Sequence, residues 1–164
     1  MISAGIDLGS GFSKALIYGE NGKVLGRAIA KTRADFDAAA REVLDDAIAN
    51  AKLKPADVNY VCTTGLGRYA VSFRDIQVTE ITAEARGAWV LFNQAQFVLD
   101  VGAQSTRAIR LRDNGKVKEF YTNEKCAAGG GAFLVRAAKY LEVPLDSLGK
   151  LSLDAKASQA ISSV

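Results

Sequence analysis

Residues 6–24 read IDLGSGFSKALIYGENGKV, and residues 99–117 read LDVGAQSTRAIRLRDNGKV. The two stretches align without a gap, so that Asp7 matches Asp100 and both copies end in Asn-Gly-Lys-Val. An internal match of this length indicates that one supersecondary unit has been duplicated.

Each copy has the pattern of a three-stranded meander. An apolar run that carries the aspartate leads into a Gly-containing turn and a second alternating run, and the Asn-Gly pair that follows is a strong hairpin signal. In the first copy we expect strands at residues 2–8, 12–18 and 23–30, and in the second a meander over residues 97–122.

The turn after the aspartate has the chemistry of a phosphate site. Small residues and backbone N–H groups in such a turn form an anion-binding concavity, and the nearby carboxylate can hold Mg²⁺, usually through waters. Either copy alone could equally be an ordinary hairpin with a solvated aspartate. Because Asp7 and Asp100 recur at the same place in the same turn, the phosphate interpretation is favoured.

Composition excludes several classes of protein. The chain has 164 residues, 49% hydrophobic and 24% charged, so it can build a core. With 21 Lys and Arg against 18 Asp and Glu and no long basic run, no nucleic-acid partner is expected. The arginines of residues 107–112 alternate with other residues and are expected on a solvated strand face.

The chain also lacks the features of membrane and secreted proteins. No apolar run approaches the roughly 20 residues of a membrane span, and the N-terminus has no signal-peptide pattern. There is no histidine, which excludes His-based catalysis and His metal ligands within this chain. Two cysteines make no disulfide framework, so a cytoplasmic location is expected.

Helical periodicity occurs in three places. A helix from residue 35 to about 52 has Asp35 or Thr32 as its candidate cap; a second spans 81–92, and a third ends near 141. Short strands are expected at 58–63 and 76–78. The apolar residues on one side of each helix are expected in the core: Phe36, Ala40, Val43, Ala47 and Ile48; Ile81, Ala85, Ala88, Trp89 and Phe92; and Phe133, Ala137, Tyr140 and Leu141.

The two cysteines differ in their surroundings. Cys62 lies in an expected strand, where a small buried thiol is the simplest interpretation. Cys126 precedes three glycines, residues 129–131, at the start of a helix, where amide dipoles favour a thiolate or a metal centre. Because three glycines lower helix stability, we expect them to permit a close approach.

The order of the motifs resembles one protein family. The chain is similar to activators of 2-hydroxyacyl-CoA dehydratases and ATP-binding subunits of benzoyl-CoA reductase (the BadF/BadG/BcrA/BcrD type), within the actin-like ATPase superfamily. The matching motifs are Gly5-Ile6-Asp7-Leu8-Gly9-Ser10, Thr64-Gly65-Leu66-Gly67-Arg68, Thr79-Glu80-Ile81 with Gly87-Ala88, Asp100-Val101-Gly102-Ala103-Gln104, and Asn123 to Gly131.

The resemblance implies an α/β fold. It is the duplicated, ribonuclease H-like fold of actin-like ATPases, in which each half has a three-stranded meander plus parallel strands and helices, and the two turns grip ATP phosphates across a cleft. Residues 1–94 would form the first subdomain and residues 95–164 an incomplete second one. The family continues beyond residue 164, where the adenine site and a second cluster cysteine are expected.

The resemblance also implies residue roles. Asp7 and Asp100 would serve Mg²⁺ and the attacking water, and Glu80 is a looser match to a glutamate that positions water. Cys126 would ligate a [4Fe–4S] cluster shared between two subunits. The residues that would hold the ATP phosphates are Gly9, Ser10, Gly11, Ser13 and Lys14 on one side, and Gly102, Ala103 and Gln104 on the other.

The implied function is ATP-driven electron transfer. ATP hydrolysis would drive a low-potential electron from a ferredoxin or flavodoxin through the cluster to an acyl-CoA reductase or dehydratase. The second ATPase subunit would be another copy of this chain or a related protein.

Two departures from the activator pattern favour the benzoyl-CoA reductase branch. Residues 102–105 read Gly-Ala-Gln-Ser where activators usually carry Gly-Gly-Gln-Asp, and Glu84 stands where they carry a histidine. Two alternatives remain open: a small-molecule kinase of the same superfamily, and a non-catalytic actin-like interaction module.

Overall fold

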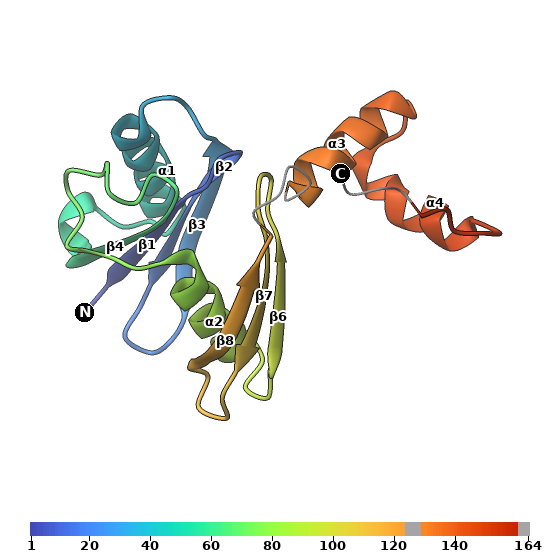
Figure 1. The fold of residues 1–164 in the computed structure, drawn as a ribbon. Helices are drawn as coiled ribbons and strands as arrows, with labels where there is room; N and C mark the ends of the chain where they lie inside the picture. Colours follow the sequence, from blue (N-terminus) through green and yellow to red (C-terminus); the bar gives the residue numbers. More distant parts are fainter. Residues whose placement is uncertain (124–128, 161–164) are drawn as a thin grey trace. The chain divides into compact units, whose positions relative to one another are not determined.

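The structure is a computed structural model that describes residues 1–123 and 129–160. The chain divides into two compact units, Met1–Leu91 and Phe92–Val164 (Figure 1). In the described ranges no helix combines the length and apolarity needed to cross a membrane.

The first unit contains a five-stranded sheet with the order β3-β2-β1-β4-β5. The meander strands are antiparallel, whereas β4 pairs parallel to β1 and β5 parallel to β4. Its elements are β1 (Ser3–Leu8), β2 (Phe12–Tyr18), β3 (Val24–Lys31), α1 (Phe36–Asn50), the 3₁₀ turn η1 (Pro55–Asp57), β4 (Tyr60–Gly65), β5 (Ile76–Gln77) and α2 (Glu80–Leu91).

Helix α1 covers one face of this sheet and forms the core with it (Figure 1). The Asp35 carboxylate accepts hydrogen bonds from the amides of Asp37 and Ala38, so Asp35 is the N-cap. A Cβ at Gly26 would lie 2.3 Å from the Ala47 carbonyl oxygen, so helix and strand pack backbone to backbone. The buried residues are Ala4, Ile6, Leu8, Ala15, Ile17, Ala39, Ala40, Val43, Ala47, Ile48 and Val71.

The second unit contains a three-stranded antiparallel sheet with the order β6-β7-β8. Its elements are β6 (Phe97–Val101), β7 (Thr106–Leu111), β8 (Val117–Thr122), α3 (Gly130–Tyr140), the 3₁₀ turn η3 (Leu145–Ser147) and α4 (Leu148–Asp154).

The structure confirms that the sequence repeat is a repeat of backbone geometry. Asp7 pairs across the strands with Lys14, and Asp100 pairs with Arg107 at the equivalent register. Each middle strand has an irregularity at the same position, between residues 17 and 18 and between residues 110 and 111. In both Asn-Gly turns the glycine has φ +74°, a left-handed conformation that favours glycine.

Two predicted buried faces are wrong in part. In α2 Ala85 is buried, but Ile81 and Trp89 are half-buried and Phe92 lies outside the helix and is exposed. In α3 the residue that is buried is Ala138, while Phe133 and Tyr140 are 52% and 89% exposed. The apolar spacing identifies the helices correctly, but burial requires a packed neighbour that spacing does not specify.

Candidate functional site

The two turns that follow Asp7 and Asp100 have the same geometry. The Gly9 amide donates to the Phe12 carbonyl (3.2 Å), and the Gly102 amide donates to the Ser105 carbonyl (2.8 Å). A Cβ at either glycine would lie 3.0–3.1 Å from the carbonyl that its own amide binds. Glycine is therefore the residue that lets each turn close this tightly.

The closed turns leave two backbone amides each without an acceptor. In the described ranges the N–H groups of Ser10 and Gly11, and those of Ala103 and Gln104, donate no hydrogen bond. Such adjacent amides form a concavity with partial positive charge that suits a phosphate oxygen. The residues present therefore fit the nucleotide phosphates that the sequence predicts.

Each aspartate forms an ion pair with the basic residue directly across the meander. Lys14 Nζ lies 2.9 Å from Asp7 Oδ2, and Arg107 Nη1 lies 3.2 Å from Asp100 Oδ2. The Arg107 side chain is only 13% exposed, so the expectation that it lies on a solvated face is wrong. The ion pairs orient each carboxylate beside its turn. The expectation that both carboxylates serve one magnesium site concerns the arrangement of the units and stays a prediction.

Ser13 supports the turn that follows Asp7 through a hydrogen bond with Thr32. Its side chain is buried, and its hydroxyl shares a 3.0 Å hydrogen bond with that of Thr32. Thr32 in turn donates to the Gly9 carbonyl at 2.7 Å. Thr32 therefore stabilises the turn that follows Asp7. The sequence did not indicate this role, because the position of Thr32 before the first helix suggested only a helix cap.

A cavity of about 970 Å³ lies on the face of the first sheet opposite α1. Asp7 is the one carboxylate among its described lining residues, and Lys14, Cys62 and Thr64 also line it. Gly65, at the end of β4, has φ +87°, and a Cβ there would lie 2.6 Å from Asp7 Oδ1. The glycine thus leaves the space that the Asp7 carboxylate occupies. A single carboxylate of this kind suits Mg²⁺ held largely through waters.

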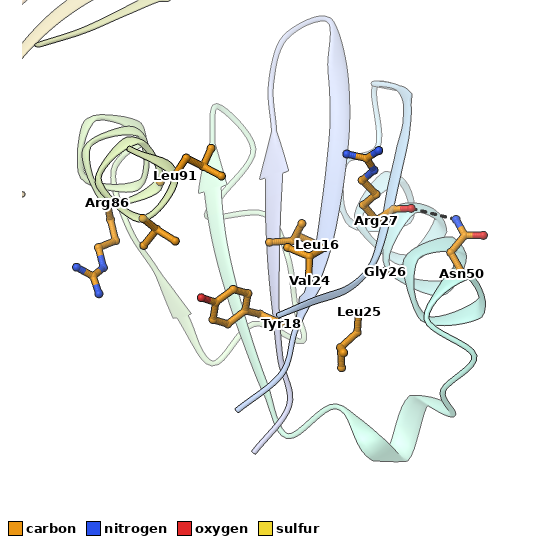
Figure 2. Close-up of a pocket in the computed structure, with 11 residues that line it drawn as sticks. Leu16, Tyr18, Val24, Leu25, Gly26, Arg27, Asn50, Arg86 and Leu91 are labelled. Carbon is orange, nitrogen blue, oxygen red and sulfur yellow. Dashed lines mark hydrogen bonds between the residues drawn. The ribbon is translucent and has the colours of Figure 1, made fainter. Parts of the chain in front are cut away.

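A second hollow on the same unit, of about 1020 Å³, has a different character (Figure 2). Apolar side chains of the meander and α2 line it, among them Leu16, Val24 and Leu91, and Asn50 donates to the Arg27 carbonyl at its edge. None of its described lining residues carries a carboxylate. It therefore lacks the ligands that a magnesium–phosphate site requires.

The three glycines before α3 pack the start of that helix onto the second turn. The Gly131 amide donates to the Gly102 carbonyl (3.0 Å), and the Ala132 amide donates to the Ala103 carbonyl (3.2 Å). Added Cβ atoms would lie 2.7 Å from the Ala103 oxygen at Gly129 and 2.8 Å from the Gly102 oxygen at Gly131. The predicted close approach is confirmed, and the segment approached is the turn that follows Asp100.

Glu80, Cys126 and Cys62 are the other residues that the sequence singles out. Glu80 begins α2 and is half-buried, but it does not line the cavity that contains Asp7. Cys126 lies outside the described residues. Cys62 is half-buried rather than buried, and desolvation raises the pKa of its thiol, which disfavours a reactive thiolate.

Known proteins with similar sequences carry the names of dehydratase activators and of a reductase component. The chain is 37% identical to the activator of lactoyl-CoA dehydratase from Anaerotignum propionicum, over 99% of this chain and 62% of that protein. It is 36% identical to a subunit of benzoyl-CoA reductase from Thauera aromatica, over 99% of this chain and 59% of that protein. The chain thus spans about three fifths of these relatives, and the two identities do not separate the branches.

A solved structure shares the fold. The activator of the 2-hydroxyisocaproyl-CoA dehydratase from Clostridium difficile, solved with bound ADPNP, superposes with a TM-score of 0.88 at 31% identity, covering 99% of this chain and 60% of that one. The predicted actin-like ATPase fold is confirmed. The model of the BadF/BadG/BcrA/BcrD ATPase family matches residues 4–164, and the chain belongs to that family.

Proposed function

We propose that this chain is the ATP-binding part of a protein that hydrolyses ATP to drive low-potential electron transfer, through a [4Fe–4S] cluster between two subunits, to an acyl-CoA reductase or dehydratase. Family membership and the names of the relatives support this proposal. A similar activator was solved with an ATP analogue, which supports ATP as the nucleotide. The electron donor would be a ferredoxin or flavodoxin.

The observation that carries the proposal is the contact between the second turn and the segment after Cys126. The amides of Gly131 and Ala132 bind the carbonyls of Gly102 and Ala103, whose turn also holds the two unpaired amides. A change in the phosphates at that turn would therefore act directly on the helix that begins a few residues after the cysteine. ATP hydrolysis and cluster environment would be coupled by this backbone link.

The residues of the turns would perform positioning and charge stabilisation. The free amides of Ser10 and Gly11, and of Ala103 and Gln104, would donate to phosphate oxygens. Asp7 and Asp100 would hold Mg²⁺ through waters and orient the attacking water. Magnesium supplies charge neutralisation of the phosphates when bound. Lys14 and Arg107 hold the two carboxylates in place before the nucleotide arrives.

The test is purification of the full-length gene product under anaerobic conditions, with its ATPase partner, followed by measurement of iron content, visible absorption and ATP hydrolysis. We expect a visible iron–sulfur band, ATP turnover and loss of the band in Cys126→Ser with ATP binding retained. Ser10→Ala is the matched control, since it keeps the backbone amide and should keep the cluster.

The two alternatives make different predictions in the same experiment. An iron-free protein that transfers phosphate from ATP to a small molecule would be a kinase. A protein that binds neither ATP nor iron would be an interaction module. Either result would contradict the proposed function.

A further inference from the structure

The hydroxyl of Thr64 is unusual among the polar groups near Asp7. Its Oγ1 atom is buried and has no hydrogen-bond partner in the described part of the chain. Buried hydroxyl groups in native proteins nearly always have a partner, and an exception requires an explanation such as a missing water, ion or catalytic role.

Thr64 is placed next to Asp7 by strand pairing. Strands β1 and β4 are parallel, and Asp7 and Thr64 are register partners. Both residues line the same cavity, opposite the face covered by α1. Its neighbour Thr63 also borders this cavity, but the Thr63 side chain is fully buried and its hydroxyl donates to the Arg68 carbonyl at 2.9 Å.

The loop after Thr64 holds this position. Arg68 Nη1 donates to the Gly65 carbonyl at 2.9 Å, and the left-handed Gly65 lets the end of β4 lie against the Asp7 carboxylate. The strand end is therefore held beside Asp7 by contacts of Gly65 and the Arg68 side chain that do not involve the Thr64 hydroxyl. The hydroxyl contributes nothing visible to this packing.

We propose that the Thr64 hydroxyl is a positioning group for the metal site of Asp7, where it hydrogen-bonds a water of the magnesium hydration shell. This inference rests on the proposed function. This role requires Thr64 to adopt another staggered rotamer, which turns the hydroxyl from its buried position toward the cavity that both residues line. The hydroxyl then restrains the water shell through which Asp7 holds the cation, as outer-shell partners do in other metal sites.

The test compares Thr64→Val with Thr64→Ser in the full-length gene product. Binding of Mn²⁺ in the presence of a non-hydrolysable ATP analogue is measured by electron paramagnetic resonance, and thermal unfolding is measured without nucleotide. We expect Thr64→Val to weaken Mn²⁺ binding about 10- to 100-fold, and Thr64→Ser to restore it. The unfolding midpoint of Thr64→Val should be unchanged or higher, because an unpaired buried hydroxyl is removed.

Thr63→Val is the matched control. It removes a hydroxyl that has a partner, so it should lower the unfolding midpoint. Unchanged Mn²⁺ binding in Thr64→Val overturns the inference and leaves the proposed function intact, as does a lowered midpoint that Thr64→Ser does not restore. Absence of Mn²⁺–nucleotide binding in the unmodified protein overturns both.

Discussion

The two copies of the meander share their backbone geometry, but equivalent positions differ in exposure within the described residues. Ile6 in β1 is 1% exposed, whereas its counterpart Leu99 in β6 is 71% exposed. Conversely, Ile109 in β7 is 1% exposed, whereas its counterpart Leu16 in β2 is 37% exposed. Within the described residues, positions that face α1 in the first copy, such as Ile6, correspond to exposed positions in the second, such as Leu99.

The two copies show which features depend on nearby residues and which depend on tertiary packing. The turns, the strand register and the left-handed glycines depend on residues a few positions apart, and they recur in both copies. Burial depends on which helix packs against the sheet, and α1 has its small residues Ala39, Ala40 and Ala47 against the first copy. The repeat therefore keeps its turns and strand register, although the exposure of its strand faces differs within the described residues.

The prediction with the largest expected effect tests whether the turns after Asp7 and Asp100 are functionally equivalent. Asp7→Asn and Asp100→Asn should each lower ATP turnover of the full-length gene product by about 10²- to 10³-fold, because each removes a charge that acts on the phosphates. The unfolding free energy should change by less than about 1 kcal/mol, since both ion pairs are partly exposed.

Steady-state hydrolysis and urea unfolding measure the two quantities for these variants. Glu119→Gln removes an exposed carboxylate that pairs with Arg110 in the middle of its strand, away from the turn of its own unit, and it should leave turnover unchanged. Turnover at the unmodified rate in either aspartate variant would refute the role of that aspartate.

The second prediction tests the difference in burial. Ile6→Ala should destabilise the 164-residue chain by about 2–5 kcal/mol, because it leaves a cavity in the core against α1. Leu99→Ala, at the matched position, should change the unfolding free energy by no more than about 0.5 kcal/mol. Urea unfolding followed by circular dichroism measures both, and equal losses would show that the Leu99 face is covered in solution.

The third prediction tests whether the two Asn-Gly turns contribute equally to stability. Gly22→Ala and Gly115→Ala should each cost about 1–2 kcal/mol, because both glycines have φ +74°. The two losses should agree within the error of thermal unfolding. Gly87→Ala, in the interior of α2 with nothing near its added Cβ, should instead be stabilising by about 0.5–1 kcal/mol. If substitution at only one of the two Asn-Gly turns left stability unchanged, the two turns would not be equivalent.

The smallest effect concerns a contact found in the first unit. Hydrogen bonds, chiefly from the Ser72 amide and also from its hydroxyl, hold the pKa of Asp37 below its ordinary value of 3.8, with Arg41 adding to the effect. The stabilisation is therefore present above the ordinary pKa and is lost as pH falls through the lowered one. Between about pH 5 and pH 2, the unmodified chain should lose more stability than Asp37→Asn.

Thermal unfolding across this pH range measures the Asp37 effect. Ser72→Ala keeps the backbone amide, so it should retain most of the pH dependence. Identical pH profiles for the unmodified chain and Asp37→Asn would contradict the assignment.

The candidate site was predictable to the extent that it is local. The aspartates and the glycine turns follow from chemistry that acts within short segments, and the three glycines of residues 129–131 indicated a close approach without identifying its partner. The support from Thr32 and the position of Thr64 beside Asp7 could not be predicted, because they depend on contacts between residues 23 or more positions apart. The domain assignment of residues 1–94 and 95–164, and the role of Glu80, stay predictions.

The sequence by itself determined the duplicated meander, its turns and the helix periods, because backbone conformation and amphipathic spacing are properties of neighbouring residues. Tertiary structure decided which apolar faces are buried, which hydroxyl braces a turn and which basic residue is withdrawn from solvent. Those outcomes depend on packing between segments distant in the chain, as where α1 covers the face of the first sheet that carries Ile6 and Ile17.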